Sequence, residues 1–83
     1  MENQREVSLL QSLVNKAETL KTYNKKTFDD IFNVLKGAPE LQTSKTTILL
    51  NDSLTEKNWI NFKYNLIDEM VKKIGDISML NIA

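Results

Sequence analysis

The fold is decided by residues 59–75, whose sequence is WINFKYNLIDEMVKKIG. Apolar residues recur there at spacings of three and four, which is typical of an amphipathic helix. Upstream, Ser53 and Glu56 match the S-x-x-E capping box that begins many helices. Downstream, we expect Gly75 to end the helix in the left-handed C′ position. The pattern therefore predicts a long helix over about residues 54–74.

This helix carries two apolar stripes instead of one. The first stripe consists of Trp59, Phe62, Leu66 and Met70, and the second of Ile60, Ile67, Val71 and Ile74. A helix at the edge of a small bundle needs only one such stripe. The second stripe therefore indicates that the helix is central in the fold or that one stripe meets another chain.

Two further helices are predicted before this one. Residues 3–23 repeat apolar side chains at helical spacing without an interrupting Gly or Pro. In residues 27–36, Thr27 is the expected N-cap, Gly37 the expected left-handed C′ residue, and Pro39 follows the end. The apolar face of the first helix is formed by Val7, Leu10, Leu13, Val14, Ala17 and Leu20.

Residues 44–50 fit a strand by propensity, but Ser44 also fits the cap of a short helix. A strand would need residues 77–82 as its partner, and we favour the short helix. The segment after Gly75 is rich in apolar residues, and exposing them to water would be unfavourable. We expect it to dock, on its own core in preference to another chain; its apolar residues are Ile77, Met79, Leu80 and Ile82.

The predicted fold class is therefore all-α: one domain, residues 1–83, forming a small bundle of three main helices with a short extra helical turn and a docked C-terminal tail. A chain of 83 residues buries a limited core, so its stability is marginal by default. With no cysteine for disulfides, self-association is the open route to more stability.

Composition argues against enzymatic chemistry. The chain has neither histidine nor cysteine, which removes the commonest general base and the commonest zinc ligands. The adjacent acids Asp29-Asp30 and Asp68-Glu69 fit a helix start and exposed i,i+4 ion pairs. No glycine-rich phosphate loop or spaced calcium ligands are present. We expect no catalytic, cofactor or metal site.

The candidate partner-binding residues are aromatic and apolar, since such residues are enriched at interface centres. For Trp59 and Phe62, burial in the core is the favoured alternative because they share a face with Leu66 and Met70. The candidates are Trp59, Phe62, Tyr64, Ile77, Met79, Leu80 and Ile82.

Residues 28–60 can also be interpreted as a helix-turn-helix, and this gives a second hypothesis, DNA binding. Its candidate contacts are Lys25, Lys26, Lys45 and Lys57. Eleven basic residues balance eleven acidic ones, and Arg5 is the single arginine, so the basic excess and arginines typical of DNA-binding proteins are missing.

We therefore expect a non-catalytic protein–protein interaction module: a small regulator, adaptor or inhibitor that binds another protein and self-associates. The alternatives are a helix-turn-helix-like DNA-binding regulator and a structural homo-oligomer. The absence of a long apolar run and the polar start at Glu2 predict a cytoplasmic protein without a membrane span. The many Asn and Lys residues fit an AT-rich genome and a phage or plasmid origin.

Overall fold

The computed structural model describes the backbone of residues 2–82 and the side chains of residues 4–79. Within residues 2–82 it contains four α-helices, one short 3₁₀ turn and no strand, which confirms the all-α class. The elements are α1 (Glu2–Glu18), α2 (Lys25–Gly37), η1 (Pro39–Leu41), α3 (Ser44–Leu50) and α4 (Trp59–Ile82).

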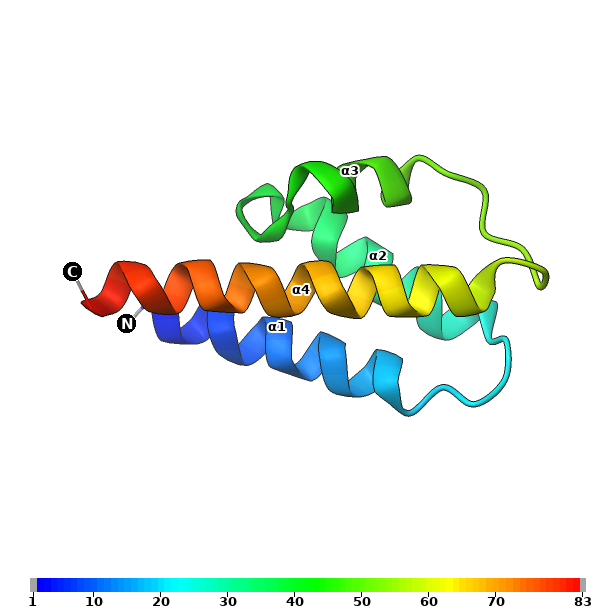
Figure 1. Cartoon of the computed structure of the whole chain (residues 1–83), viewed down its shortest axis with the longest axis horizontal. Helices are drawn as coiled ribbons and strands as arrows, with labels where there is room; N and C mark the ends of the chain where they lie inside the picture. Colours follow the sequence, from blue (N-terminus) through cyan, green and yellow to red (C-terminus); the bar gives the residue numbers. More distant parts are fainter. Residues whose placement is uncertain (1, 83) are drawn as a thin grey trace.

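The helices alternate in direction along a bundle of 42 × 22 × 19 Å (Figure 1). α1 and α4 lie side by side and antiparallel, and they make the most extensive helix pair in the fold. α3 packs on α4, while α2 contacts α1. α2 also meets α4 through the tilted rings of Phe32 and Phe62, whose centroids lie 6.2 Å apart. α4 is therefore the central helix, as its two apolar stripes indicated.

The first apolar stripe of α4 forms the centre of one hydrophobic core. Phe62, Leu66 and Met70 are buried, and Ile77 joins them because it lies seven residues, about two helical turns, beyond Met70. The other buried apolar residues come from α1, α2 and their connections: Leu10, Leu13, Val14, Ala17, Leu20, Phe28, Ile31, Phe32, Leu35 and Leu41.

The short helix predicted over residues 44–50 is confirmed as α3. Its N-cap is Thr43 instead of the expected Ser44. The Thr43 hydroxyl accepts a hydrogen bond from the Thr46 amide at 3.1 Å, and the Thr46 hydroxyl accepts one from the Thr43 amide. This reciprocal capping box overrides the strand propensity of the β-branched residues that follow.

The expectation that both glycines take left-handed C′ positions is wrong. Gly37 is the last residue of α2, Gly75 lies inside α4, and neither has a positive φ. At the end of α2 the Ala38 amide donates to the Leu35 carbonyl. Glycine permits a left-handed residue but does not require one, so α4 continues through Gly75 into the predicted tail.

The end of α1 and the start of α2 also differ from expectation. α1 ends at Glu18, before Tyr23, and the Thr19 hydroxyl bonds back to the Lys16 carbonyl at 2.8 Å. α2 begins at Lys25, and its N-cap is Asn24 instead of the expected Thr27. The Asn24 side chain accepts a hydrogen bond from the Thr27 amide.

The capping box expected at Ser53 and Glu56 does not form, and α4 begins at Trp59. Asn58 organises this turn instead. Its amide oxygen accepts from the Thr55 amide at 2.7 Å, and its amide nitrogen donates to the Ser53 carbonyl at 2.9 Å. The Asn58 side chain thus holds the turn that leads into α4.

Candidate functional site

The second apolar stripe of α4 reaches the surface. We call Ile60, Tyr64, Ile67, Val71 and Ile74 the α4 stripe; successive members are spaced by four, three, four and three residues. Tyr64 is 62% exposed, and Ile60 and Val71 are each 51% exposed. Ile67 and Ile74 are partly buried. Alternating spacings of four and three keep one continuous line of side chains on one face of a helix.

Shallow hollows lie along the α4 stripe where it borders α1. One is at the loop end of the bundle, and the other lies further along the two helices. The first is lined by Leu20, Lys21, Trp59, Ile60, Lys63 and Tyr64, and the second by Gln11, Val14, Asn15, Val71 and Ile74. On the side of the stripe away from α1, a third hollow is lined by Tyr64, Asn65, Ile67, Asp68 and Val71.

The borders of the α4 stripe carry few charges. On the α1 side, Gln11 and Asn15 are uncharged, and the charged neighbours are Lys21, which follows α1, and Lys63 on α4. Lys63 is held there because its ammonium donates to the Leu20 carbonyl at 2.7 Å. On the other side Asn65 is uncharged and Asp68 is exposed. Depletion of charge around an apolar centre is the compositional mark of a protein interface.

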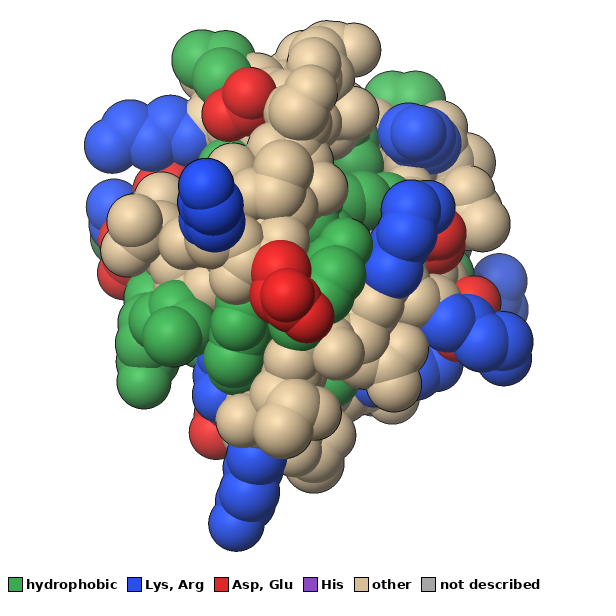
Figure 2. Space-filling view, turned by 90° about the vertical axis from the view of Figure 1, so that its right-hand side faces the viewer, with side chains coloured by type: hydrophobic (Ala, Val, Ile, Leu, Met, Phe, Trp, Pro, Cys, Tyr) green, Lys and Arg blue, Asp and Glu red, His purple; other side chains and the backbone are tan. Residues whose placement is uncertain are grey.

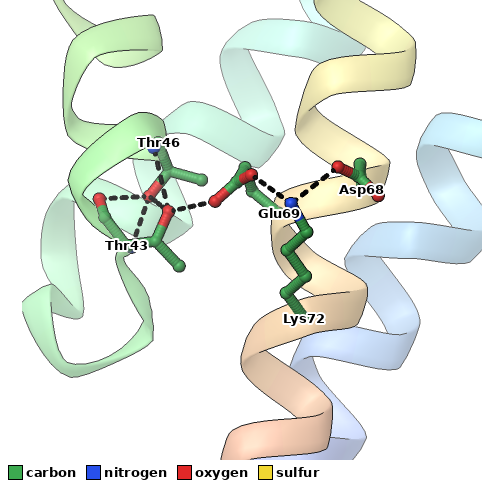
Figure 3. Close-up of polar contacts among 5 residues, drawn as sticks. All are labelled: Thr43, Thr46, Asp68, Glu69 and Lys72. Carbon is green, nitrogen blue, oxygen red and sulfur yellow. Dashed lines mark hydrogen bonds and ion pairs between the residues drawn. The ribbon is translucent and has the colours of Figure 1, made fainter.

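A polar cluster lies on the opposite flank of α4, where α3 packs (Figure 3). The Glu69 side chain is buried, and its two oxygens accept from the Thr43 hydroxyl at 2.9 Å and from the Lys72 ammonium at 3.4 Å. Lys72 also pairs with Asp68 at 3.1 Å. Hydrogen bonds to Asp68 first, and to Glu69 second, raise the pKa of Lys72 above its ordinary 10.5.

This polar cluster borders a cavity of about 250 Å³ between α3 and α4, lined by Lys45, Ile48, Leu49, Asn65, Asp68 and Glu69. Both Glu69 oxygens are already engaged, one with the Thr43 hydroxyl and the other with the Lys72 ammonium. In the described part of the chain no buried side-chain polar atom lacks a hydrogen-bond partner. The arrangement holds α3 on α4.

The residues predicted to bind a partner are not brought together. Phe62 and Ile77 are buried in the core, whereas Tyr64 and Met79 are exposed. Trp59 is half-buried beside Leu20 and Lys21. The predicted contacts at Leu80 and Ile82 fall outside the side chains that the structure describes.

The α4 stripe includes four residues that were not on the candidate list: Ile60, Ile67, Val71 and Ile74. Their spacing was visible in the sequence as the second stripe. The favoured core position of the first stripe is confirmed for Phe62, Leu66 and Met70. What the sequence did not contain was that the second stripe reaches the surface. Tyr64 lies on the same face between Ile60 and Ile67, so it makes the line of the stripe continuous.

The lysines of the DNA hypothesis do not share one face. Lys25 and Lys26 open α2, and Lys57 precedes α4 at the same loop end, whereas Lys45 is in the first turn of α3, which follows the far end of α2 (Figure 1). Lys25 is also paired with Asp29 at 2.8 Å. At the loop end, blue lysine side chains stand apart around the rim, with hydrophobic and acidic side chains between them (Figure 2). DNA binding stays a prediction without a structural feature behind it.

Within the described residues, no helix has the combination of length and hydropathy that a bilayer crossing requires. The same residues contain no group of three or more acidic, histidine or cysteine side chains arranged to hold a metal ion. Comparison of this chain with protein-family models, curated proteins and solved structures found no match. The candidate site therefore stands on its own geometry: an apolar line on the central helix, bordered by amides and a few charged side chains.

Proposed function

We propose that this chain is a non-catalytic protein-binding module whose binding surface is the α4 stripe. The observation that carries the proposal is the exposure of Ile60, Tyr64 and Val71 in one line on the central helix. Water contact with these side chains is unfavourable by roughly 25 cal/mol per Å² of apolar area, so covering them with a partner is a source of binding free energy.

The chemistry of this surface favours a protein partner. Nucleic acid needs clustered cations, whereas the cations that line the hollows along the stripe are only Lys21 and Lys63. A small ligand needs a concave pocket that covers most of its surface, whereas the hollows along the stripe are shallow. A helix or another apolar surface from a protein matches an elongated line of this kind.

A module of this kind acts by occupying a surface. A small regulator or inhibitor covers the contact face of its target, and it needs no reactive group to do so. Tyr64 is the best anchor in the stripe because its ring supplies apolar contact area while its hydroxyl stays available for a hydrogen bond.

Site-specific photo-crosslinking tests the proposal. A benzophenone amino acid is placed at position 64 or at position 71, and a matched control carries it at Ile48, which is 65% exposed on α3. We expect adducts of defined mass with a protein chain from positions 64 and 71, and none from position 48. The proposal fails if positions 64 and 71 give no protein adduct in cells that express the chain.

A further inference from the structure

We propose that the chain held at the α4 stripe is a second copy of this protein, and that the two α4 helices pair in parallel around a two-fold axis. This inference rests on the proposed function of the stripe and adds the identity and orientation of the partner. It makes the stripe self-complementary, as an interface with two-fold symmetry must be.

The spacing of the stripe is that of a two-helix seam. In heptad terms Tyr64 and Val71 occupy a positions, and Ile60, Ile67 and Ile74 occupy d positions. From Ile60 to Ile74 the seam is about 21 Å long at 1.5 Å per residue. The first stripe, with Phe62, Leu66 and Met70, packs in this chain's own core. In the seam, Ile67 and Ile74 pack partly against that core, whereas Ile60, Tyr64 and Val71 are exposed and can meet an equivalent helix.

Charges at the two edges of the seam select the parallel orientation. Lys63, at a g position, lies on the α1 side, where its ammonium contacts Leu20. Asp68, at an e position five residues later, lies on the α3 side beside Lys45 and Ile48. Around a parallel two-fold axis, the α1 side of one copy faces the α3 side of the other. Each Lys63 then faces Asp68 of the other copy, which is the usual g-to-e ion pair of parallel helices.

An antiparallel pair would place like edges together. The Asp68 carboxylates of the two copies would approach each other, and the α1 helices would lie on the same side of the seam. Like charges across a helix interface are unfavourable, so the charge pattern disfavours this arrangement.

The two charged side chains are free to form the cross-pair. The Lys63 ammonium has three donors, and the structure uses one of them on Leu20. Asp68 is exposed and shares Lys72 with Glu69, so Lys72 keeps an acidic partner if Asp68 turns toward Lys63 of the other copy.

Sedimentation velocity over a concentration series tests the partner's identity. A seam of this length belongs to the small end of specific interfaces, so we expect a dimer with a dissociation constant on the order of micromolar. Val71→Glu should leave a folded monomer, because position 71 is half exposed in the single chain. Asn33→Glu, at an exposed position of α2 that lines none of the hollows of the stripe, should dimerise like the original protein. A monomer or a trimer of the original protein would overturn the proposal.

Introduced cysteines test the orientation, since the chain has none of its own. In the parallel pair, Val71→Cys faces itself across the axis and should form a disulfide-linked dimer on mild oxidation. In an antiparallel pair position 71 would face position 67, so cross-linking would require a mixture of Val71→Cys with Ile67→Cys. Efficient linking of the mixture, with none for Val71→Cys alone, would overturn the parallel arrangement.

Charge reversal gives an independent check of the orientation. Lys63→Glu and Asp68→Lys should each raise the dimer dissociation constant, on the order of tenfold for a pair of like charges. The double variant restores opposite charges across a parallel seam and should recover most of the affinity. In an antiparallel dimer each residue would face its own equivalent, so like charges would meet in every variant and neither single substitution should change the dissociation constant much. Circular dichroism melts of each variant confirm that the monomer is folded.

These outcomes separate this inference from the proposed function. If the crosslinker at position 64 captures a different protein and the purified chain is monomeric, the stripe is a binding surface but the second copy is wrong. If position 64 captures nothing in cells and the purified chain is monomeric, both proposals fail.

Discussion

The Thr43 hydroxyl donates a hydrogen bond of 2.9 Å to the buried carboxylate of Glu69, joining the start of α3 to α4 across 26 residues of sequence. Glu69 is only 6% exposed, and Thr43 is also the N-cap of α3. One hydroxyl group therefore holds the first turn of a seven-residue helix and satisfies a carboxylate in the helix packed against it.

Removal of this hydroxyl should destabilise the protein. Thr43→Val keeps the side-chain shape but loses the cap, worth ~1 kcal/mol. It also leaves a buried Glu69 oxygen without its donor, which lowers the stability by a further ~1–3 kcal/mol. We expect the free energy of unfolding in urea to fall by roughly 2–4 kcal/mol. Thr43→Ser keeps the hydroxyl and should lose far less, and equal losses for the two variants would contradict this account.

The start of α4 should depend on Asn58. Asn58→Ala removes the hydrogen bonds to the Thr55 amide and the Ser53 carbonyl, and we expect a loss of ~1 kcal/mol in thermal or urea unfolding. Ser53→Ala is the matched control, since Ser53 is exposed and its hydroxyl caps nothing here; its effect should stay within about 0.5 kcal/mol. If the Ser53 variant proves the more damaging, the capping box read from the sequence forms after all.

Gly75→Ala should stabilise the protein. Gly75 has no positive φ, lies inside α4, and has no atom within 4 Å of the position that an added Cβ would take. Alanine is favoured over glycine in a helix by ~0.5–1 kcal/mol. Differential scanning calorimetry should therefore show a higher melting temperature. A lower melting temperature would indicate that Gly75 ends the helix in a left-handed conformation.

Lys72 should give the stability a dependence on alkaline pH. Its pKa is raised in the folded protein by hydrogen bonds to Asp68 and then Glu69. A raised pKa means that the stability contributed by Lys72 is present below its unfolded-state value of 10.5 and is lost as pH rises through the folded value.

The stability difference between the original protein and Lys72→Met should therefore be constant from about pH 7 to 9 and shrink above the ordinary lysine pKa. Urea titrations across this range measure it. Lys72→Arg stays charged and should keep its advantage over Lys72→Met at high pH. A difference that grows with alkaline pH would contradict the assigned ion pairs.

The sequence by itself determined the helical class and the approximate place of each helix. Apolar spacing is a local property, so α1, α2 and α4 were visible without knowledge of their neighbours. The same spacing showed that α4 has two apolar stripes. The predicted docking of the segment after Gly75 on the chain's own core is confirmed for Ile77, whereas Met79 is exposed.

The tertiary structure decided that the second stripe stays at the surface, because that depends on where the other helices lie around α4. It also decided the helix boundaries. Short polar side chains at several nearby positions were equally good caps by residue type, and packing selected Asn24, Thr43 and Asn58 over Thr27, Ser44 and Ser53. Gly75 remained helical because α4 has packing contacts on both sides of it, through Met70 and Ile77. Burial is a relation between segments distant in the chain, and a local pattern cannot fix it.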